Sequence, residues 1–221
     1  MRSAFREQLD VIGDELAEMS RLSSIAMRQA VRALQTGDGG LAESVIASDT
    51  EIDNLRDGLE IRSFDLLALQ APVATDLRAI VASLRMVFDL ERMGDLAVHV
   101  AKVARLRRPN PVLPGPLMEL IAEMGRTAAD LGDRAADMIR TRDAEAVREL
   151  ERADDELDRM HRSLFQALAR HDDTVSNEAT IDAVLLGRYC ERFGDHAVSL
   201  GERVVFLVTG QFPPRHVVEP I

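Results

Sequence analysis

The sequence predicts an all-α protein made of two tandem, pseudo-symmetric three-helix bundles, with six long antiparallel helices in total. Three observations point to this fold class. Aromatic residues make up only 4% of the 221 residues and Trp is absent, so the composition is poor in strand formers. Apolar residues recur at alternating spacings of three and four, as on one face of a helix. Several motifs of the first half also return in the second half, as in proteins built from repeats.

Three helices are expected in the first half. An apolar heptad seam begins at Phe5 and stops at the glycine-rich cluster 37–40, which is typical of a helix end. The same period then resumes and predicts a second helix up to a turn at Pro72, because proline cannot continue a hydrogen-bonded helix. Thr75 or Asp76 is expected to cap a third helix, which runs to the next proline cluster.

A proline-rich segment divides the chain. Residues 109–116 hold half of the eight prolines and are predicted to be a stiff linker. It separates a first bundle, residues 1–108, from a second bundle, residues 117–210, and residues 211–221 form a C-terminal tail. The helices expected in the second bundle span about 117–140, 143–171 and 176–209.

Charge and composition exclude several functions. The net charge is −11 and no basic block occurs, so we expect no nucleic-acid partner, because phosphate binding needs clustered Lys and Arg. No signal-peptide core and no apolar run of the roughly 20 residues that span a membrane is present, so a cytoplasmic location is expected. Cys190 is the single cysteine, which excludes internal disulfides and thiolate zinc sites; it is expected to be a small buried residue.

Pairs of acidic residues spaced i, i+4 occur at equivalent places in the two halves. This spacing puts both carboxylates of a pair on one helix face. One such pair is usually a solvated surface feature of an acidic chain, but four pairs at equivalent positions favour a common function. The pairs are Asp49/Asp53 and Glu91/Asp95 in the first half, and Asp154/Asp158 and Glu191/Asp195 in the second.

Antiparallel pairing is expected to bring these acids together. If the first hairpin folds near residue 73.5, residue 53 lies level with residue 94; a fold near 173.5 places residue 158 level with 189. Four carboxylates should then converge in each bundle, and their repulsion calls for a cation. Arg92 and Arg192 follow the motif glutamates directly and so point about 100° away around the helix. A hard metal ion such as magnesium, manganese or iron is therefore a better candidate for the positive charge than these arginines. Carboxylate oxygens that bridge between ions would allow a multinuclear cluster.

Other residues near the motifs have simpler interpretations. Gly94 and Gly194 lie in helix interiors, where close helix packing explains a missing side chain. His161 follows Asp158 by three residues, but its counterpart in the first half is Arg56, so we expect it at the surface. The remaining histidines near the motifs, His99 and His196, are expected to be partly buried and hydrogen-bonded.

The motifs are similar to those of a known family. The segment Leu-Gln-Ala-Pro-Val-Ala-Thr-Asp-Leu-Arg at 69–78 precedes Glu-Arg-Met-Gly-Asp at 91–95, and Glu-Arg-Phe-Gly-Asp follows at 191–195. With these motifs the chain resembles the PhoU family, the accessory regulators of high-affinity phosphate uptake in bacteria. The resemblance covers both halves. One difference is Arg188, which stands where the first half has Phe88.

The resemblance implies a function as well as a fold. It implies paired three-helix bundles with multinuclear metal clusters, of iron in some members and of magnesium, manganese or zinc in others. It also implies a non-enzymatic negative regulator that contacts the phosphate transporter ATPase and the membrane sensor histidine kinase. Such a regulator holds the kinase in its repressing mode when phosphate is plentiful. Many members of the family form homodimers. The membrane would then be reached only through these partners. The metal role carries over to Glu91, Asp95, Glu191 and Asp195 and, by the hairpin register, to Asp49, Asp53, Asp154 and Asp158.

Three other functions stay open on the sequence. An all-helical magnesium-dependent nucleotide pyrophosphohydrolase also clusters carboxylates on helices, but no repeated Lys or Arg is placed beside these acids to hold phosphates. A ferritin-like di-iron protein would need Glu-x-x-His on two helices, and none occurs. Two plain helical bundles with acidic, solvated faces would bind nothing at these positions.

Overall fold

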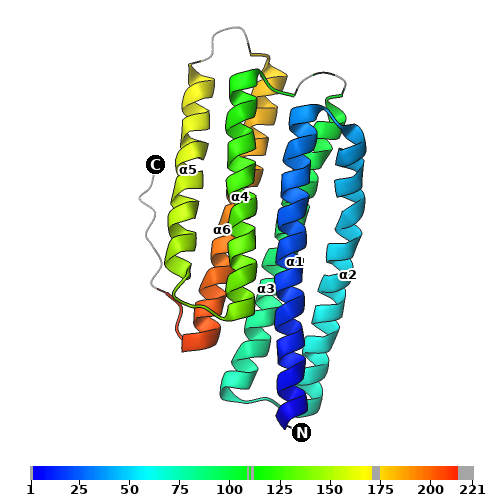
Figure 1. Ribbon diagram of the computed structural model, residues 1–221, viewed down its shortest axis with the longest axis vertical. Coiled ribbons are helices and arrows are strands. Elements are labelled where there is room, and N and C mark those ends of the chain that lie inside the picture. Colours follow the sequence, from blue (N-terminus) through cyan, green and yellow to red (C-terminus); the bar gives the residue numbers. More distant parts are fainter. Residues whose placement is uncertain (1, 109, 111, 171–174, 214–221) are drawn as a thin grey trace.

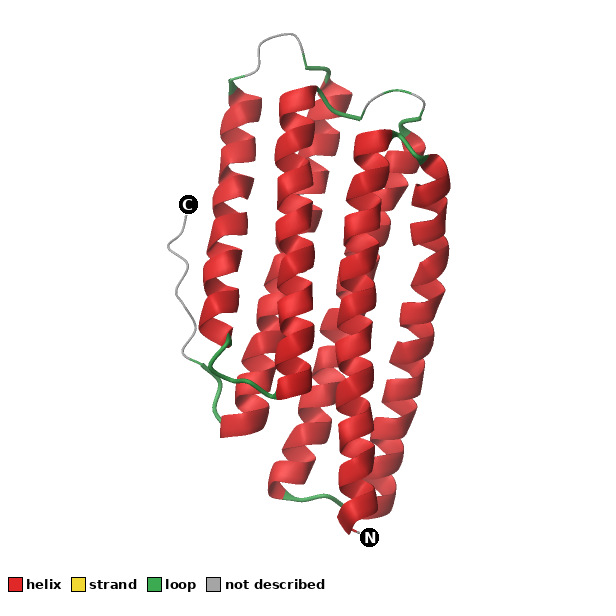
Figure 2. Cartoon of the chain, in the orientation of Figure 1, coloured by secondary structure: helices red, strands yellow, loops and turns green. Residues whose placement is uncertain are grey.

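The described part of the chain folds into six α-helices and contains no strand, which confirms the predicted fold class (Figures 1 and 2). The computed structural model describes residues 2–108, 110, 112–170 and 175–213. The helices run side by side along the longest axis of the molecule and are joined end to end by short connections. They are α1 (Arg2–Thr36), α2 (Gly39–Gln70), α3 (Ala74–Leu106), α4 (Gly115–Thr141), α5 (Val147–Ala169) and α6 (Asn177–Thr209).

The two sets of three helices pack against each other through their inner helices. In Figure 1, α1 and α4 lie in front, α3 and α6 lie behind them, and α2 and α5 flank this central group. Contacts join α1 to α4 and α3 to α6, in addition to the contacts within each set. Buried apolar residues from all six helices therefore form one continuous core rather than two separate ones.

Small residues let α1 and α4 approach closely. A Cβ added at Gly125 would lie 2.3 Å from a methyl carbon of Val31, and one added at Gly132 would lie 2.3 Å from Ser24 Oγ. Ser20 Oγ donates a hydrogen bond of 2.8 Å to the Gly132 carbonyl, across the same interface. Larger side chains at these glycines would push the helices apart, so this contact depends on small residues.

The start of α3 differs from the prediction. The helix begins at Ala74 after Val73, which makes no side-chain capping bond, so capping by Thr75 or Asp76 is wrong. The connection from α2 is only three residues long, and it brings both polar residues inside the helix. Asp76 stabilises the first turn of α3 in another way, because a negative charge there complements the helix dipole.

The second set of helices shows one further difference. The helix expected from residue 143 begins only at Val147, because the Asp143 carboxylate accepts a hydrogen bond of 3.0 Å from the Glu145 N–H and forms a turn instead. Ser176 caps α6 by accepting a bond of 3.1 Å from the Ala179 N–H.

The predicted linker is only partly described. Pro109 and Pro111, like the tail beyond residue 213, lie outside the described residues. Val112 and Leu113 are buried against the core, and Pro116 lies in the first turn of α4, where its missing N–H costs no helix bond. Among the described helices, none is both long enough and apolar enough to cross a membrane.

Candidate metal centres

The four acids of the first half lie on facing stripes of α2 and α3. Asp49 and Asp53 are partly buried on α2, and Glu91 and Asp95 are partly buried on α3. The connection after Gln70 centres the hairpin on Pro72 rather than near 73.5, so Asp53 lies level with Glu91 and Asp49 with Asp95. The two pairs therefore face each other, with a register three residues, or most of a helical turn, different from the one expected.

The motif glycines make room for the opposite helix, as predicted. A Cβ at Gly94 would lie 3.0 Å from the side chain of Ile52 and 3.4 Å from an Asp49 carboxylate oxygen. A Cβ at Gly194 would lie only 2.6 Å from an Asp154 oxygen. In both halves the missing side chain therefore lets a carboxylate of the neighbouring helix lie against the motif.

Burial and mutual repulsion make the first cluster a poor place for several negative charges. Burial raises the pKa of Asp49 above its usual value, and the charges of Asp53 and Asp95 raise it further. Burial also raises the pKa of Glu91, and the charge of Asp95 adds to the rise. A cation bound between these side chains would relieve the repulsion.

Arginines supply positive charge in the first cluster. Arg56 donates to Asp53 at 2.7 Å and lies 3.8 Å from Glu91, so it bridges α2 and α3. Arg92 lies 3.0 Å from Asp95, and its guanidinium lies 5.4 Å from the ring centre of Phe88. The expectation that Arg92 points away from the acids is therefore wrong, because its long side chain folds back along the helix to reach them.

The second cluster is more strongly perturbed. Burial and the charges of Asp195 and Asp158 raise the pKa of Asp154 to about 7. Burial and the charge of Asp195 also raise the pKa of Glu191 to about 7, against the opposing charge of Arg188. The Glu191 side chain is 13% exposed, compared with 22% for Glu91, so Glu191 is the more buried motif glutamate, whereas Asp195 is exposed and its counterpart Asp95 is partly buried.

Arg188 is the main counter-charge of the second cluster. Its guanidinium lies 2.5 Å from one oxygen of Glu191 and 2.6 Å from the other. Arg162 lies 3.9 Å from Asp158, a looser contact. The sequence marked Arg188 as a difference between the halves, and the structure shows that this difference places a cation directly on a motif glutamate.

His161 is not the surface residue that was expected. Its Nε2 is buried without a hydrogen-bond partner among the described residues, and its ring lies in the notch left by Gly187. Burial lowers the pKa of His161, and the charge of Arg188 lowers it further, which favours the neutral imidazole. A glycine on the facing helix was the sequence signal that could have located this histidine.

Of the other two histidines, one is partly buried and hydrogen-bonded as predicted and one is not. His196 is partly buried, and its Nδ1 lies 3.0 Å from Asp89 Oδ1, which confirms the prediction. His99 is exposed and stacks on Tyr189 with ring centres 5.2 Å apart, so its predicted burial is wrong. Cys190 is buried as predicted, and burial raises the pKa of its thiol to about 12.

Sequence reasoning missed the charged residues between the two bundles. Asp89 on α3 is 5% exposed and accepts a bond of 2.7 Å from Arg203 on α6. Asp182 on α6 is 3% exposed and accepts bonds of 2.6 and 3.0 Å from Arg107, just after α3. These pairs join residues 75 or more positions apart, so no local spacing could have indicated them.

The donor atoms of the acid clusters suit a metal ion, but the side chains are not arranged as a metal site in this structure. Among the described residues, no three His, Cys, Asp or Glu side chains are gathered closely enough to hold a metal ion. The donors are carboxylate oxygens, which suit hard cations such as Mg²⁺ and Mn²⁺. Metal binding would therefore require the bridging arginines to turn away and the carboxylates to change rotamer.

Comparisons with known proteins find matches over both halves of the chain. A family model described as "PhoU domain" matches residues 16–104 and again 121–204. The "Phosphate-specific transport system accessory protein PhoU homolog 2" of Mycobacterium tuberculosis is 46% identical over 213 residues, which is 96% of this chain and 100% of that protein. A homolog 1 of Mycobacterium leprae is also 46% identical, over 96% of each chain.

Solved structures show the same fold. The crystal structure of PhoU from Pseudomonas aeruginosa superposes with a TM-score of 0.82 at 27% identity, covering 94% of this chain and all of that one. A regulatory PhoU protein from Streptococcus pneumoniae gives a TM-score of 0.85 at 24% identity, covering 96% and 100%, and supports the fold alone. Because the family model matches both halves and the relatives align over almost the whole chain, the protein belongs to the PhoU family.

Proposed function

We propose that this protein is a non-enzymatic, metal-binding regulator of phosphate uptake and of the phosphate-starvation response. It acts in the cytoplasm as an adaptor between the ATPase of a phosphate ABC transporter and a sensor histidine kinase, and it represses the response when phosphate is abundant. It meets the membrane through these partners and works as a homodimer. The observation that carries the proposal is family membership over both halves of the chain.

The relatives' names support a role beside the transporter. Proteins 46% identical to this chain are named accessory proteins of a phosphate-specific transport system, a name that describes a role beside a transporter and no catalytic activity. The net charge of −11 also favours protein partners over nucleic acid.

The metal part of the proposal rests on the acid clusters. Asp49, Asp53, Glu91 and Asp95 would hold an ion in the first bundle, and the corresponding list for the second bundle is Asp154, Asp158, Glu191 and Asp195. The ion would be Mg²⁺, Mn²⁺, iron or Zn²⁺, in a multinuclear cluster where carboxylates bridge. When bound, it would neutralise the mutually repelling carboxylates and fix α2 to α3 and α5 to α6, which stabilises the faces available to partners.

Deleting the gene tests the regulatory role. Cells without the protein are expected to express alkaline phosphatase and the phosphate transporter in high phosphate, because repression is lost. Reporter activity measured in high and low phosphate, with a complemented strain as the control, distinguishes the outcomes. Unchanged repression in the deleted strain would contradict the proposal.

Replacing Asp95 by lysine tests the metal site of the first bundle separately. The substitution Asp95→Lys brings an ammonium among the remaining carboxylates, so this bundle is expected to lose its cation while its helices stay folded. Elemental analysis of the purified protein measures bound metal, and circular dichroism measures helix content. Glu51→Lys makes the same charge change at an exposed position of α2 and is expected to keep the wild-type metal content. Normal metal content in Asp95→Lys would contradict the assignment.

A further inference from the structure

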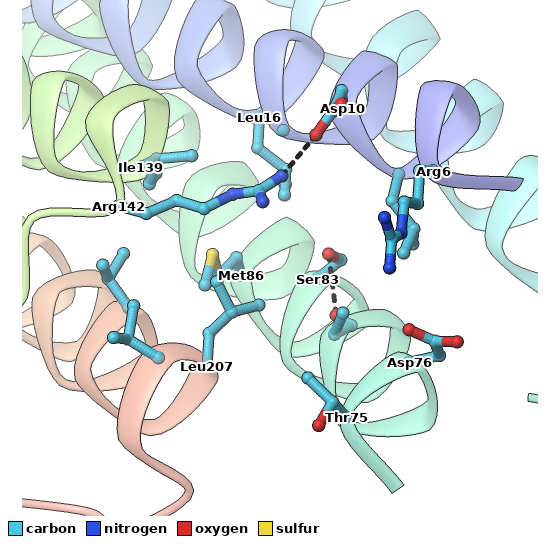
Figure 3. Close-up of a pocket in the computed structure, with 15 residues that line it drawn as sticks. Arg6, Asp10, Leu16, Thr75, Asp76, Ser83, Met86, Ile139, Arg142 and Leu207 are labelled. Carbon is cyan, nitrogen blue, oxygen red and sulfur yellow. Dashed lines mark hydrogen bonds and ion pairs between the residues drawn. The ribbon is translucent and has the colours of Figure 1, made fainter. Parts of the chain in front are cut away.

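A pocket of about 520 Å³ opens at the end of the molecule where α4 and α6 stop and α1 and α3 continue (Figure 1). Its inner wall is apolar: Leu16 and Met86 are buried, and Ile139 and Leu207 extend the wall from α4 and α6 (Figure 3). Small-molecule sites commonly have volumes of about 300–1,000 Å³, largely apolar walls and a few polar groups. This pocket, which shares no residue with the acid clusters, has the size and lining of such a site.

Charged side chains stand at the mouth of the pocket. Arg142 lies 2.6 Å from Asp10 through one guanidinium nitrogen, which leaves further N–H donors for a ligand. Asp76 lies in the first turn of α3, where its charge complements the helix dipole. Arg6 has no ion pair or hydrogen bond to another described residue, although it lines the same mouth. Asp76 makes no ion pair with a described residue either, but only Arg6 and Arg142 bring N–H donors to this mouth, and those of Arg6 are all free for an anionic ligand.

Gly13 on α1 supplies an independent observation. Glycine in a helix interior is less stable than alanine, so close packing against a neighbour usually explains it. Here no atom lies within 4 Å of the place that a Cβ would occupy, and Gly13 lines the pocket. The missing side chain enlarges the pocket instead of accommodating another helix.

We propose that this pocket binds a small amphiphilic carboxylate. The apolar chain lies against Leu16, Met86 and Ile139, and the carboxylate accepts hydrogen bonds from Arg6 and from the free donors of Arg142. The walls exclude a ligand that is polar throughout, and the unpaired arginine selects an anionic head over a neutral or cationic one. This site is separate from the metal centres, so ligand binding here does not depend on a bound metal.

Three probes of equal chain length test the proposal on the full-length protein: decanoate, decanol and decyltrimethylammonium. Isothermal titration calorimetry is expected to show the tightest binding for decanoate, and Arg6→Gln is expected to weaken decanoate about tenfold while leaving decanol unchanged. Gly13→Leu fills the pocket and is expected to abolish binding of every probe. Gly58→Ala, another interior helix glycine with open space around it, is the matched control and is expected to bind like the wild type.

The outcomes separate this site from others. Thermal unfolding first establishes that Gly13→Leu is folded, which is expected because leucine favours a helix over glycine. Decanoate binding that persists in folded Gly13→Leu would place the ligand elsewhere and overturn the proposal. Equal affinity for decanoate and decyltrimethylammonium would overturn the role of Arg6. If the wild type binds none of the three probes and Gly13→Leu loses binding to a protein partner, the proposal is overturned. The pocket would then hold an apolar side chain of that partner.

Discussion

Replacing Asp89 by alanine is expected to lower the free energy of unfolding by about 3 kcal/mol, because removing one partner of a buried ion pair leaves the other charge uncompensated. Asp89 lies on α3 with a side chain 6% exposed, and it accepts from Arg203 at 2.7 Å. His196 Nδ1 lies 3.0 Å away on its other side, also on α6. The substitution therefore disrupts both polar contacts by which this residue joins the two bundles.

Urea unfolding followed by circular dichroism measures the effect. Asp137→Ala is the matched control, because Asp137 also lies between helices of the two halves, 3.5 Å from Arg21, but its side chain is 64% exposed. Exposed ion pairs contribute about 0–1 kcal/mol, so this control is expected to stay near the wild type. Equal losses in the two variants would show that burial of the Asp89 carboxylate does not determine its contribution.

The helices were predictable because each carries its own apolar period. The heptad seam from Phe5 places Ile12 and Leu16 inside, and both are buried in the structure. On α3 the sequence places apolar residues on two stripes, one with Leu90 and Met93 and one with Phe88 and the acids, and local spacing does not rank them. The stripe with Leu90 and Met93 is fully buried, whereas Phe88, on the stripe with the acids, is 56% exposed. Contacts with α1 and α6 decide this choice, and local spacing carries no information about them.

The acid clusters were predictable for a different reason. Spacing of four on two neighbouring helices, repeated in both halves, is a local signal that antiparallel packing converts into proximity. The ion pairs between arginines and these acids were not predictable, because a long flexible side chain can turn toward either of two faces of its helix. Arg56 follows Asp53 by three residues and Arg188 precedes Glu191 by three, so both spacings allowed an ion pair without requiring one.

Without metal, the protein is expected to lose stability as the pH rises from about 4 to about 7, and Asp154→Asn is expected to remove a large part of this loss. The pKa of Asp154 is about 7 in the folded chain, well above the value of an unfolded aspartate. The folded state therefore binds more protons than the unfolded state between these limits. Its stability is highest at the acidic end and is lost as the pH rises through the folded pKa.

At about pH 8 the Asp154→Asn variant is expected to be more stable than the metal-free wild type by on the order of 1–2 kcal/mol, after discounting for solvent screening. Thermal unfolding in a chelator across this pH range measures the difference. Glu156→Gln, at an exposed position of the same helix, is the control and is expected to follow the wild type. Added Mn²⁺ should stabilise the wild type at high pH more than Asp154→Asn, because the variant has lost one carboxylate ligand and the repulsion that a cation would relieve. A wild type that is equally stable at both ends of the range would show that the second cluster carries no electrostatic strain for a metal to relieve.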